Sequence, residues 1–433
     1  MSMSNRALRN AVLALAVAGC AVGGLAGTQI AGAAATQTPP GTYAYVTDSG
    51  GNTVTVINTA TNSVTATIPV GTLPLGVAVS SDGKRVYVTD GLSDNVSVID
   101  ATTDTVAATV PVGGDPQAVA LTPDGTQAFV ANDLDGTVSV INTATDTVTA
   151  TIVVGSHPEG VAISPDGTRA YVANTNGSSI SVIDTSTDTV ISTVTVGTIP
   201  VGMVVDGTHV WVADAGDGTV SVIDTSNDSV TKIAAGGSPY GVAASGDGGT
   251  IYETDRADNV MNIIAAGTQT ITGSVPTGTT PQQIALTPDG SHAYIPNLGS
   301  NNVSVINLAT QSAGTPIAVG SSPLGVAIGT IQQAPTTLTA GTGHLSLLPL
   351  GVTDLNATLT SNGAPVAGQT IAFTADDGTP LCRAVTNASG YATCDAVPPI
   401  LTTVGVLLGG YQASFAGSVF FKSSSAHGSL ELL

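Results

Sequence analysis

Residues 74–110 read PLGVAVSSDGKRVYVTDGLSDNVSVIDATTDTVAATV and contain four short runs with the pattern of β-strands. A small apolar run at 76–80 is followed, after an Asp-Gly turn, by the alternating run 85–89. Two more runs occupy 95–100 and 106–110, with a polar loop and a Thr-rich turn before them. Runs of about five residues joined by tight turns predict a four-stranded antiparallel meander.

The aromatic residue in the second run, Tyr87, recurs along the chain at a nearly constant interval. The seven aromatic residues are Tyr45, Tyr87, Phe129, Tyr171, Trp211, Tyr252 and Tyr294. The steps between them are 42, 42, 42, 40, 41 and 42 residues. A period near 40 with strand-like content indicates a repeat architecture. One small sheet cannot bury both of its faces, whereas radially stacked sheets bury one another, so the repeat predicts a propeller.

A proline before each small apolar run gives a second count of the units. These prolines are Pro74, Pro116, Pro158, Pro200, Pro239, Pro281 and Pro323. The first aromatic run, 43–47, has no apolar run before it, and the last apolar run, 325–328, has no aromatic run after it. We therefore expect the last run to complete the first sheet and close a ring of seven, with Val326 pairing beside Tyr45. The 40-residue step arises because Asp206-Gly207 joins two runs without a longer turn.

The composition is that of a folded protein with a very acidic surface. The 433 residues, 42% of them hydrophobic and 9% charged, suffice for two or three domains. The formal net charge is −21, and it becomes −23 without Arg6 and Arg9, since 30 acidic and 7 basic residues remain. Such a charge repels phosphate backbones and anionic lipid head groups. We therefore expect no nucleic-acid partner.

Residues 1–35 have the pattern of an export signal. Arg6 and Arg9 form a positive first region, residues 11–18 begin an apolar region, and three alanines at 33–35 offer a cleavage site. An alternative lies inside this segment, because the residues ending at Cys20 resemble a bacterial lipobox, which would make Cys20 a lipidated first residue. No later stretch has 18 consecutive apolar residues, so we expect no spanning helix. The expected location is secreted, or associated with the cell surface or cell wall.

The other two cysteines, Cys382 and Cys394, are expected to form a disulfide. They lie twelve residues apart, and in the oxidising compartment expected for an exported protein such a pair forms a disulfide. The short spacing predicts that the bridge staples a hairpin. Two ligands do not make a zinc site, and no histidine lies between them. The surrounding segment, 336–433, has short strands with turn signals every 8–12 residues and predicts a β-sandwich. The expected fold class is thus all-β, a seven-bladed propeller followed by a sandwich.

The repeat resembles the YVTN-type propeller family of surface-layer and exported proteins. The resemblance rests on segments such as Tyr87-Val88-Thr89-Asp90 and the run from Pro158 to Gly167, and it covers about residues 42–331. It implies seven blades but no single activity, because propellers host binding proteins, lactonases, lyases and copper or quinone enzymes alike. The tail resembles bacterial immunoglobulin-like domains of surface and adhesin proteins.

The residues that flank the seven prolines differ from blade to blade, although the scaffold around them is uniform. The polar cluster among them consists of Asp115, His157, Glu159 and Tyr240. His157 and Glu159 are candidates for a general acid/base pair or for binding a cation. The alternative for all four is a polar rim around a water-filled channel.

Metal and cofactor sites receive little support from the sequence. The loops after the aromatic runs carry paired acids, such as Asp90 and Asp94, which would allow calcium. They offer two carboxylates each and no closing Glu, so Asx-turns explain them as well. No three or four histidines converge, and no nucleophile elbow, phosphate-binding loop or dinucleotide fingerprint occurs. We expect no cofactor, with calcium as the one possibility.

Two hypotheses of function follow from these patterns. In the first, the chain is a monomeric, exported, non-enzymatic propeller that binds an extracellular protein or glycan. In the second, it is a lactonase-like hydrolase or lyase with His157 and Glu159 at the mouth of the channel. The second requires the four polar residues to converge around one cavity. A third possibility, a purely structural cell-wall protein, differs from the first by having no specific ligand.

Overall fold

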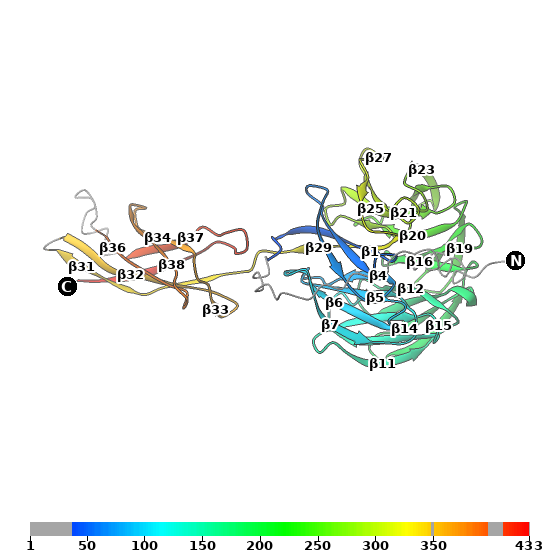
Figure 1. Ribbon diagram of the computed structural model, residues 1–433, viewed down its shortest axis with the longest axis horizontal. Coiled ribbons are helices and arrows are strands. Elements are labelled where there is room, and N and C mark those ends of the chain that lie inside the picture. Colours follow the sequence, from blue (N-terminus) through cyan, green and yellow to red (C-terminus); the bar gives the residue numbers. More distant parts are fainter. Residues whose placement is uncertain (1–36, 348–349, 397–409, 433) are drawn as a thin grey trace, which may run out of the picture. The chain divides into compact units, whose positions relative to one another are not determined.

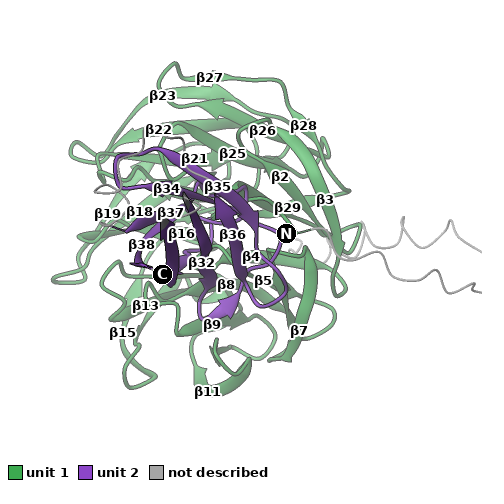
Figure 2. Ribbon diagram, turned by 90° about the vertical axis from the view of Figure 1, so that its left-hand side faces the viewer, with its two compact units in different colours: residues 1–331 green, residues 332–433 purple. Residues whose placement is uncertain are grey.

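The computed structural model describes residues 37–347, 350–396 and 410–432. The predicted export signal and Cys20 lie outside them. The chain forms two compact units, residues 1–331 and 332–433, which Figure 2 colours separately. The described residues are all-β apart from one short 3-10 turn, η1 (Thr175–Gly177).

Unit 1 is a seven-bladed β-propeller, as the repeat predicts (Figure 1). Each blade is an antiparallel sheet whose strands run in order from the innermost to the outermost. The innermost strands are β29 (Pro323–Ile331), β4 (Pro74–Val79), β8 (Pro116–Leu121), β12 (Pro158–Ile163), β16 (Pro200–Val205), β20 (Pro239–Ala244) and β24 (Ala285–Leu286). The second strands, which carry the recurring aromatic residue, are β1 (Gly41–Asp48), β5 (Arg85–Asp90), β9 (Gln127–Asn132), β13 (Arg169–Asn174), β17 (His209–Asp214), β21 (Thr250–Asp255) and β25 (His292–Asn297).

The two outer positions of each blade are equally regular. The third strands are β2 (Thr53–Asn58), β6 (Asn95–Asp100), β10 (Thr137–Asn142), β14 (Ser179–Asp184), β18 (Thr219–Asp224), β22 (Val260–Ala265) and β26 (Asn302–Asn307). The outermost strands are β3 (Ser63–Pro69), β7 (Thr105–Pro111), β11 (Thr147–Val153), β15 (Thr189–Thr195), β19 (Val230–Ala234), β23 (Thr270–Pro276) and, in the seventh blade, the fragments β27 (Ser312–Ala313) and β28 (Ile317–Ala318).

The ring closes as expected, because the last innermost strand belongs to the first blade. β29 pairs antiparallel with β1. Val326 faces Val46, and Ala327 faces Tyr45, so the predicted pairing is found within one residue. The closing strand covers the edge of β1, which is otherwise an unpaired edge that could pair with another chain.

The recurring aromatic residues pack each blade against the next one. Tyr45 of the first blade shares a buried apolar cluster with Val86 and Val88 of the second, and Tyr294 of the seventh shares one with Ala44 and Val46 of the first. All seven aromatic side chains are at most 8% exposed. Large aromatic side chains contribute most of the apolar area at such an interface. The aromatic repeat therefore holds the blades together.

A fully buried Asp or Asn ends the second strand of every blade. These residues are Asp48, Asp90, Asn132, Asn174, Asp214, Asp255 and Asn297. In six blades the side chain hydrogen-bonds a hydroxyl seven residues later on the third strand, such as Ser97 Oγ donating to Asp90 Oδ2 at 2.7 Å. The side chain also accepts an N–H from the linker that enters its own blade from the preceding one, such as Gly197 N–H to Asp214 at 3.1 Å. The group thus ties two strands and the linker together.

The linker glycine is required because the buried side chain lies against it. A Cβ built on Gly155 would lie 2.4 Å from Asn174, and one on Gly71 would lie 2.5 Å from Asp90. Real Cβ atoms do not approach other heavy atoms that closely, so the repeated glycine and the buried Asp or Asn are two halves of one contact.

Unit 2 consists of nine strands around one apolar core. They are β30 (Thr337–Ala340), β31 (Thr342–Leu347), β32 (Leu350–Ser361), β33 (Ala364–Pro365), β34 (Thr370–Ala375), β35 (Pro380–Val385), β36 (Tyr391–Ala396), β37 (Tyr411–Phe415) and β38 (Ser424–Leu432). β30, β31, β33 and β36 pair with β32, whereas β35, β34, β37 and β38 follow one another, and a parallel β31–β38 ladder joins the two groups. This arrangement is consistent with the predicted sandwich, because one core contains residues from both groups.

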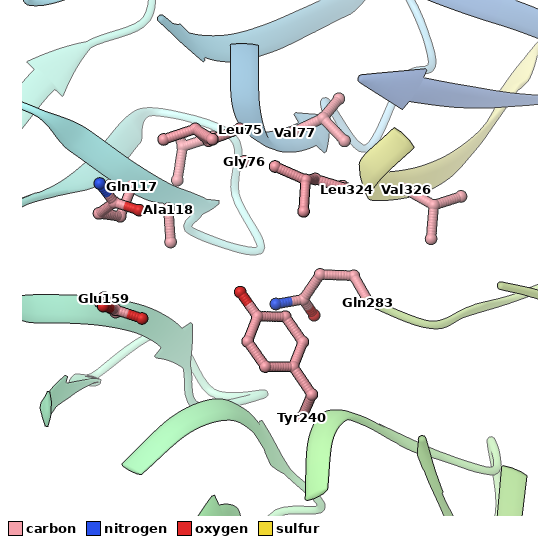
Figure 3. A pocket seen from close by; sticks show the side chains of 12 residues that line it. Leu75, Gly76, Val77, Gln117, Ala118, Glu159, Tyr240, Gln283, Leu324 and Val326 are labelled. Atoms are coloured by element: carbon pink, nitrogen blue, oxygen red, sulfur yellow. The ribbon is translucent and has the colours of Figure 1, made fainter. Parts of the chain in front are cut away.

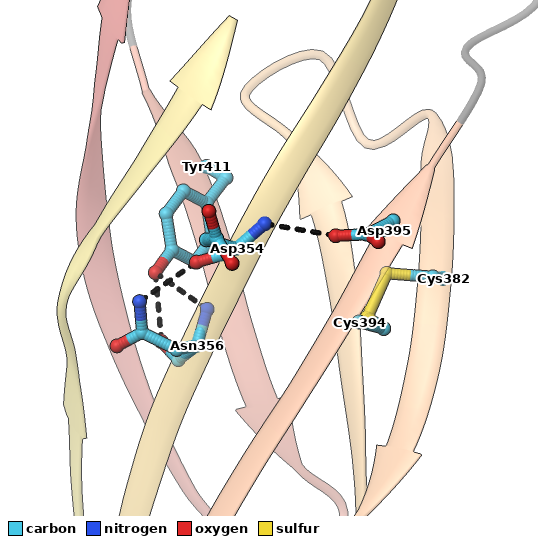
Figure 4. Close-up of a disulfide and its surroundings, with 6 residues drawn as sticks. All are labelled: Asp354, Asn356, Cys382, Cys394, Asp395 and Tyr411. Atoms are coloured by element: carbon cyan, nitrogen blue, oxygen red, sulfur yellow. Dashed lines mark hydrogen bonds between the residues drawn. A yellow bond between two sulfur atoms is a disulfide. The ribbon is translucent and has the colours of Figure 1, made fainter.

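The Cys382–Cys394 disulfide is present, with an S–S distance of 2.00 Å (Figure 4). The expectation that it staples a hairpin is wrong. Cys382 lies on β35, which pairs with β34, while Cys394 lies on β36, which pairs with β32. The bridge therefore links the two groups of strands across the core. Beside it, Asp354 has a positive φ of 58°, and its N–H donates to Asp395 Oδ1 at 2.9 Å (Figure 4).

Replacing the buried carboxylate Asp90 by the amide found in three other blades is expected to stabilise the propeller. Burial raises the pKa of Asp90 to about 6, against the opposing hydrogen bonds from Ser97 and Gly71. The folded state therefore holds its proton more tightly than the unfolded state, and wild-type stability falls as the pH rises from 3.8 to about 6. Asp90→Asn should raise the free energy of unfolding at pH 7 by about 1–3 kcal/mol and add little below pH 3.8.

Chemical denaturation of both proteins across this pH range measures the effect. Asn132→Asp is the matched reverse substitution and should be destabilising at pH 7 and less so at pH 5. An unfolding free energy of Asp90→Asn that is equal to or below that of the wild type at pH 7 contradicts the argument.

Removing the disulfide is expected to destabilise unit 2 alone. The bridge closes a twelve-residue separation, which the chain-entropy model values at about 3 kcal/mol. In the Cys382→Ser/Cys394→Ser variant, unit 2 should therefore unfold at a lower denaturant concentration, and be cleaved at a lower protease concentration, than in the wild type. The unfolding transition of the propeller, followed by the single Trp211, should stay in place. A shift of the Trp211 transition instead would show that the two units unfold together.

Candidate functional site

A central cavity of about 120 Å³ is lined by the innermost strands of five blades and by Gln283, which precedes the innermost strand of the seventh (Figure 3). Its polar side chains are Gln117, Glu159, Tyr240 and Gln283, from the third, fourth, sixth and seventh blades. Apolar side chains including Leu75 and Leu324 complete the wall. In Figure 3 the Tyr240 hydroxyl and the Gln283 amide both point into this space. The cavity is large enough for several water molecules or a small polar group of a ligand.

The structure brings together two of the four residues expected at this site. Glu159 and Tyr240 line the central cavity, whereas Asp115 and His157 are not among its lining residues. The His157 Nδ1 atom lies 3.1 Å from Asp133 Oδ2, and its side chain is 42% exposed. The Asp115 N–H donates to Asp94 Oδ1 at 3.0 Å. His157 and Glu159 therefore do not face a common cavity.

A left-handed backbone conformation separates the residue before each proline from the residue after it. Six of the seven preceding residues have φ between 52° and 59°, including Asp115, His157 and the β-branched Ile199. This conformation is rare for such residues and is maintained only where the surroundings impose it. Two side chains only two positions apart therefore point in different directions: that of His157 toward Asp133, and that of Glu159 into the central cavity.

Gln283 lines the cavity and was not predicted. The same position is Gly in five blades and Ala118 in the third. Glycine is favoured there because a Cβ on Gly160 would lie 2.0 Å from the Val201 carbonyl oxygen of the neighbouring strand. A glutamine does not fit between two strands so close together, and in the seventh blade the innermost strand β24 is reduced to two residues. The departure from glycine, visible in the sequence, was the signal for this residue.

Tyr240 is held in place by Arg256, which follows the second strand of the sixth blade. The Arg256 guanidinium carbon lies 3.2 Å from the centre of the Tyr240 ring, a cation–π contact. Arg256 also donates to the side-chain oxygen of Gln282, whose own amide donates to the Thr280 carbonyl at 3.0 Å. Arg256 covers one face of the Tyr240 ring, and the Tyr240 hydroxyl points into the cavity.

The sixth blade also contains a buried acid, Glu253, that the analysis of the repeat missed. Its position is Val or Ile in every other blade. Asn262 Nδ2 donates to Glu253 Oε2 at 2.8 Å, and the side chain is fully buried. Burial raises the pKa of Glu253 to about 8, against the hydrogen bonds from Asn262 and the Tyr240 backbone, so the carboxyl is largely protonated at neutral pH. Glu253 thus adjoins the backbone of a residue that lines the cavity.

The acids in the loops after the second strands bind backbone N–H groups. Asp135 Oδ2 accepts the Gly114 N–H at 2.8 Å, and Asp217 accepts the Thr198 N–H at 3.0 Å. These partners lie about twenty residues earlier, in the linker that enters the same blade from the preceding one, so local Asx-turns explain only part of the pattern. No group of three or more His, Cys, Asp or Glu among the described residues is placed to hold a metal ion. The described residues also contain no helix long and apolar enough to cross a membrane.

Comparisons with known proteins agree with the propeller. A family model for YNCE-like beta-propellers matches residues 5–127 and 125–203. No curated protein matches the chain by sequence. Kuenenia stuttgartiensis hydrazine synthase is similar with 25% identity and a TM-score of 0.57, over 66% of this chain and 99% of that chain.

Two further solved structures share the fold at lower identity. A protein of unknown function from Desulfotomaculum acetoxidans has 18% identity and a TM-score of 0.60, over 66% of this chain and 98% of that chain. A candidate 6-phosphogluconolactonase from Bacteroides uniformis has 21% identity and a TM-score of 0.56, over 66% and 99%. At these identities the similarity shows the fold alone.

Neutralising Glu253 is expected to remove one pH dependence of propeller stability. Because its pKa is raised in the folded state, folding takes up a proton between pH 4.5 and about 8, and stability falls as the pH rises through this window. Glu253→Gln should gain on the wild type by up to about 1.4 kcal/mol for each pH unit there. Urea denaturation at a series of pH values measures this difference. Parallel pH profiles for the two proteins would show that Glu253 ionises normally.

Proposed function

We propose that this protein is exported and binds an extracellular protein or glycan through the central cavity of its propeller, without catalysing a reaction. The observation that carries the proposal is the gathering of Gln117, Glu159, Tyr240 and Gln283 in one cavity. Elsewhere in the ring the corresponding positions are occupied by residues such as Leu75, Val201 and the glycines. A polar set confined to one cavity, on a scaffold that is otherwise repetitive, is typical of a recognition site.

The chemistry of the cavity favours binding over catalysis. Amides, a phenol hydroxyl and one carboxylate can donate to and accept from the hydroxyls of a glycan or the backbone and polar side chains of a protein. The lining residues include no histidine, serine, cysteine or lysine. The lactonase-like alternative relied on His157, whose ring is directed to Asp133 instead. Similarity to a candidate 6-phosphogluconolactonase supports the shared fold and does not favour that alternative.

Two features support an extracellular location. Residues 1–35 have the pattern of an export signal, with Cys20 as an alternative lipid attachment point. The Cys382–Cys394 bridge suits an oxidising compartment. In this proposal unit 2 is an immunoglobulin-like module that displays the propeller at the cell surface or wall. The N-terminus of the mature protein distinguishes secretion, which would begin at Thr36, from lipid attachment at Cys20.

Substitutions borrowed from other blades test the cavity. A glycan and protein array screened with the secreted form should identify a ligand, and Glu159→Val and Gln283→Gly should each weaken its binding by about tenfold or more. Each variant carries the residue that another blade has at that position, so the scaffold should tolerate it. His157→Ala is the control and should bind like the wild type. Unchanged binding by both cavity variants, or loss of binding by His157→Ala alone, contradicts the proposal.

A further inference from the structure

A second and larger pocket, of about 340 Å³, lies between the fourth and fifth blades. Glu159, in the central cavity, is near the start of β12, whereas this pocket begins just after the strand ends at Ile163. It is therefore at the other end of the innermost strand. The pocket is lined by residues 164–166, 168–169, 171, 205, 207 and 225. It has no role in the function proposed above.

The shortened turn of the repeat borders this pocket, since Val205 and Gly207 line it. In the third and fourth blades the turn after the innermost strand packs on the preceding blade: a Cβ on Gly125 would lie 3.6 Å from Ser81 Oγ, and one on Gly167 would lie 3.2 Å from Pro123. In the fifth blade this turn is shortened to residues 206–208, and a Cβ on Gly207 would meet nothing within 4 Å. The 40-residue step of the repeat thus corresponds to a shorter turn at the wall of this pocket.

Arg169 is the cationic side chain of this pocket, and the second blade shows what an arginine in its position binds. Arg85 occupies the same place relative to the aromatic residue. Its Nη1 atom donates to the Thr143 carbonyl at 2.8 Å and to the Asp146 carboxylate at 2.7 Å. Arg169 Nη1 makes the first of these contacts, to the Thr225 carbonyl at 3.0 Å. No ion pair of the described residues involves Arg169.

The carboxylate that corresponds to Asp146 is held elsewhere. It is Asp228, whose Oδ2 atom accepts a hydrogen bond from Ser192 Oγ at 2.7 Å. The residue corresponding to Ser192 in the second blade is Ala108, which has no hydroxyl. Ser192 therefore accounts for the difference: it holds Asp228, so Arg169 lacks the carboxylate that Arg85 has.

We propose that the pocket binds a hydroxylated carboxylate such as a uronic acid, with the ligand carboxylate on Arg169 in the place that Asp146 takes on Arg85. Arginine favours carboxylates because its planar donors match the two oxygens. Asp166 lines the same pocket and can accept hydrogen bonds from ligand hydroxyls. Its charge opposes a bare anion, so a ligand that carries hydroxyls beside its carboxylate fits better than acetate.

The test uses calorimetric titration of the secreted full chain with glucuronate, glucose and acetate. Glucuronate should bind at millimolar concentrations and more tightly than either glucose or acetate. Arg169→Gln, which installs the residue that the third blade has at this position, should weaken glucuronate binding by about tenfold or more. Arg85→Gln is the matched control and should bind like the wild type. Thermal unfolding of both variants checks that they are folded.

A third variant tests the role of Ser192. Ser192→Ala should release Asp228 to pair with Arg169, as Asp146 pairs with Arg85, and thereby weaken glucuronate binding without removing any lining residue. The proposal is overturned if glucuronate does not bind at millimolar concentrations, if it binds no better than glucose, or if Arg169→Gln leaves its affinity unchanged. Because Glu159 and Gln283 lie in the other cavity, their variants should not affect glucuronate, so failure here is distinct from failure of the proposed function.

Discussion

The propeller depends on one repeated contact, the buried Asp or Asn at the end of each second strand. This side chain hydrogen-bonds a hydroxyl of the third strand, as acceptor when it is Asp and as donor when it is Asn, and accepts an N–H from the linker glycine in blades such as the fifth. It thereby fixes where the chain leaves one blade and enters the next. The contact is made where no water is available to replace it, and a lost partner there costs the full desolvation of a polar group. The choice between Asp and Asn alters the charge of the contact and not its geometry, since Asn174 and Asp214 bind equivalent partners.

Much of the fold could be predicted from the sequence because each structural pattern occurs seven times along the chain. The aromatic and proline counts predicted seven blades and the closing strand, and both are present. The hairpin expected around Cys382 and Cys394 was wrong because spacing along the chain does not tell which strands pair. For the site, position relative to proline was an insufficient guide. The left-handed conformation at Asp115 and His157 directs neighbouring side chains apart. No residue pattern in the sequence predicts this conformation.

Two residues at or beside the central cavity break a rule of the scaffold. Gln283 stands where a close strand contact favours glycine, and Glu253 stands where the other blades bury an aliphatic side chain. Each is unfavourable for the stability of the fold: Gln283 lies beside a shortened innermost strand, and Glu253 is a buried acid. Scaffold positions of this kind are tolerated at functional sites and are otherwise removed by selection for stability. The sixth blade, with Tyr240, Arg256 and Glu253, contains the densest set of them.

The closing strand imposes an order on how the molecule is made. Thr42 and Thr330, whose hydroxyls lie 3.0 Å apart, are separated by 288 residues, so the first blade waits for its fourth strand until nearly the whole propeller has been synthesised. During that time β1 presents an unpaired edge, and such edges recruit strands of other chains. Closure of the ring, which needs a contact very distant in sequence, thus competes kinetically with association between neighbouring molecules.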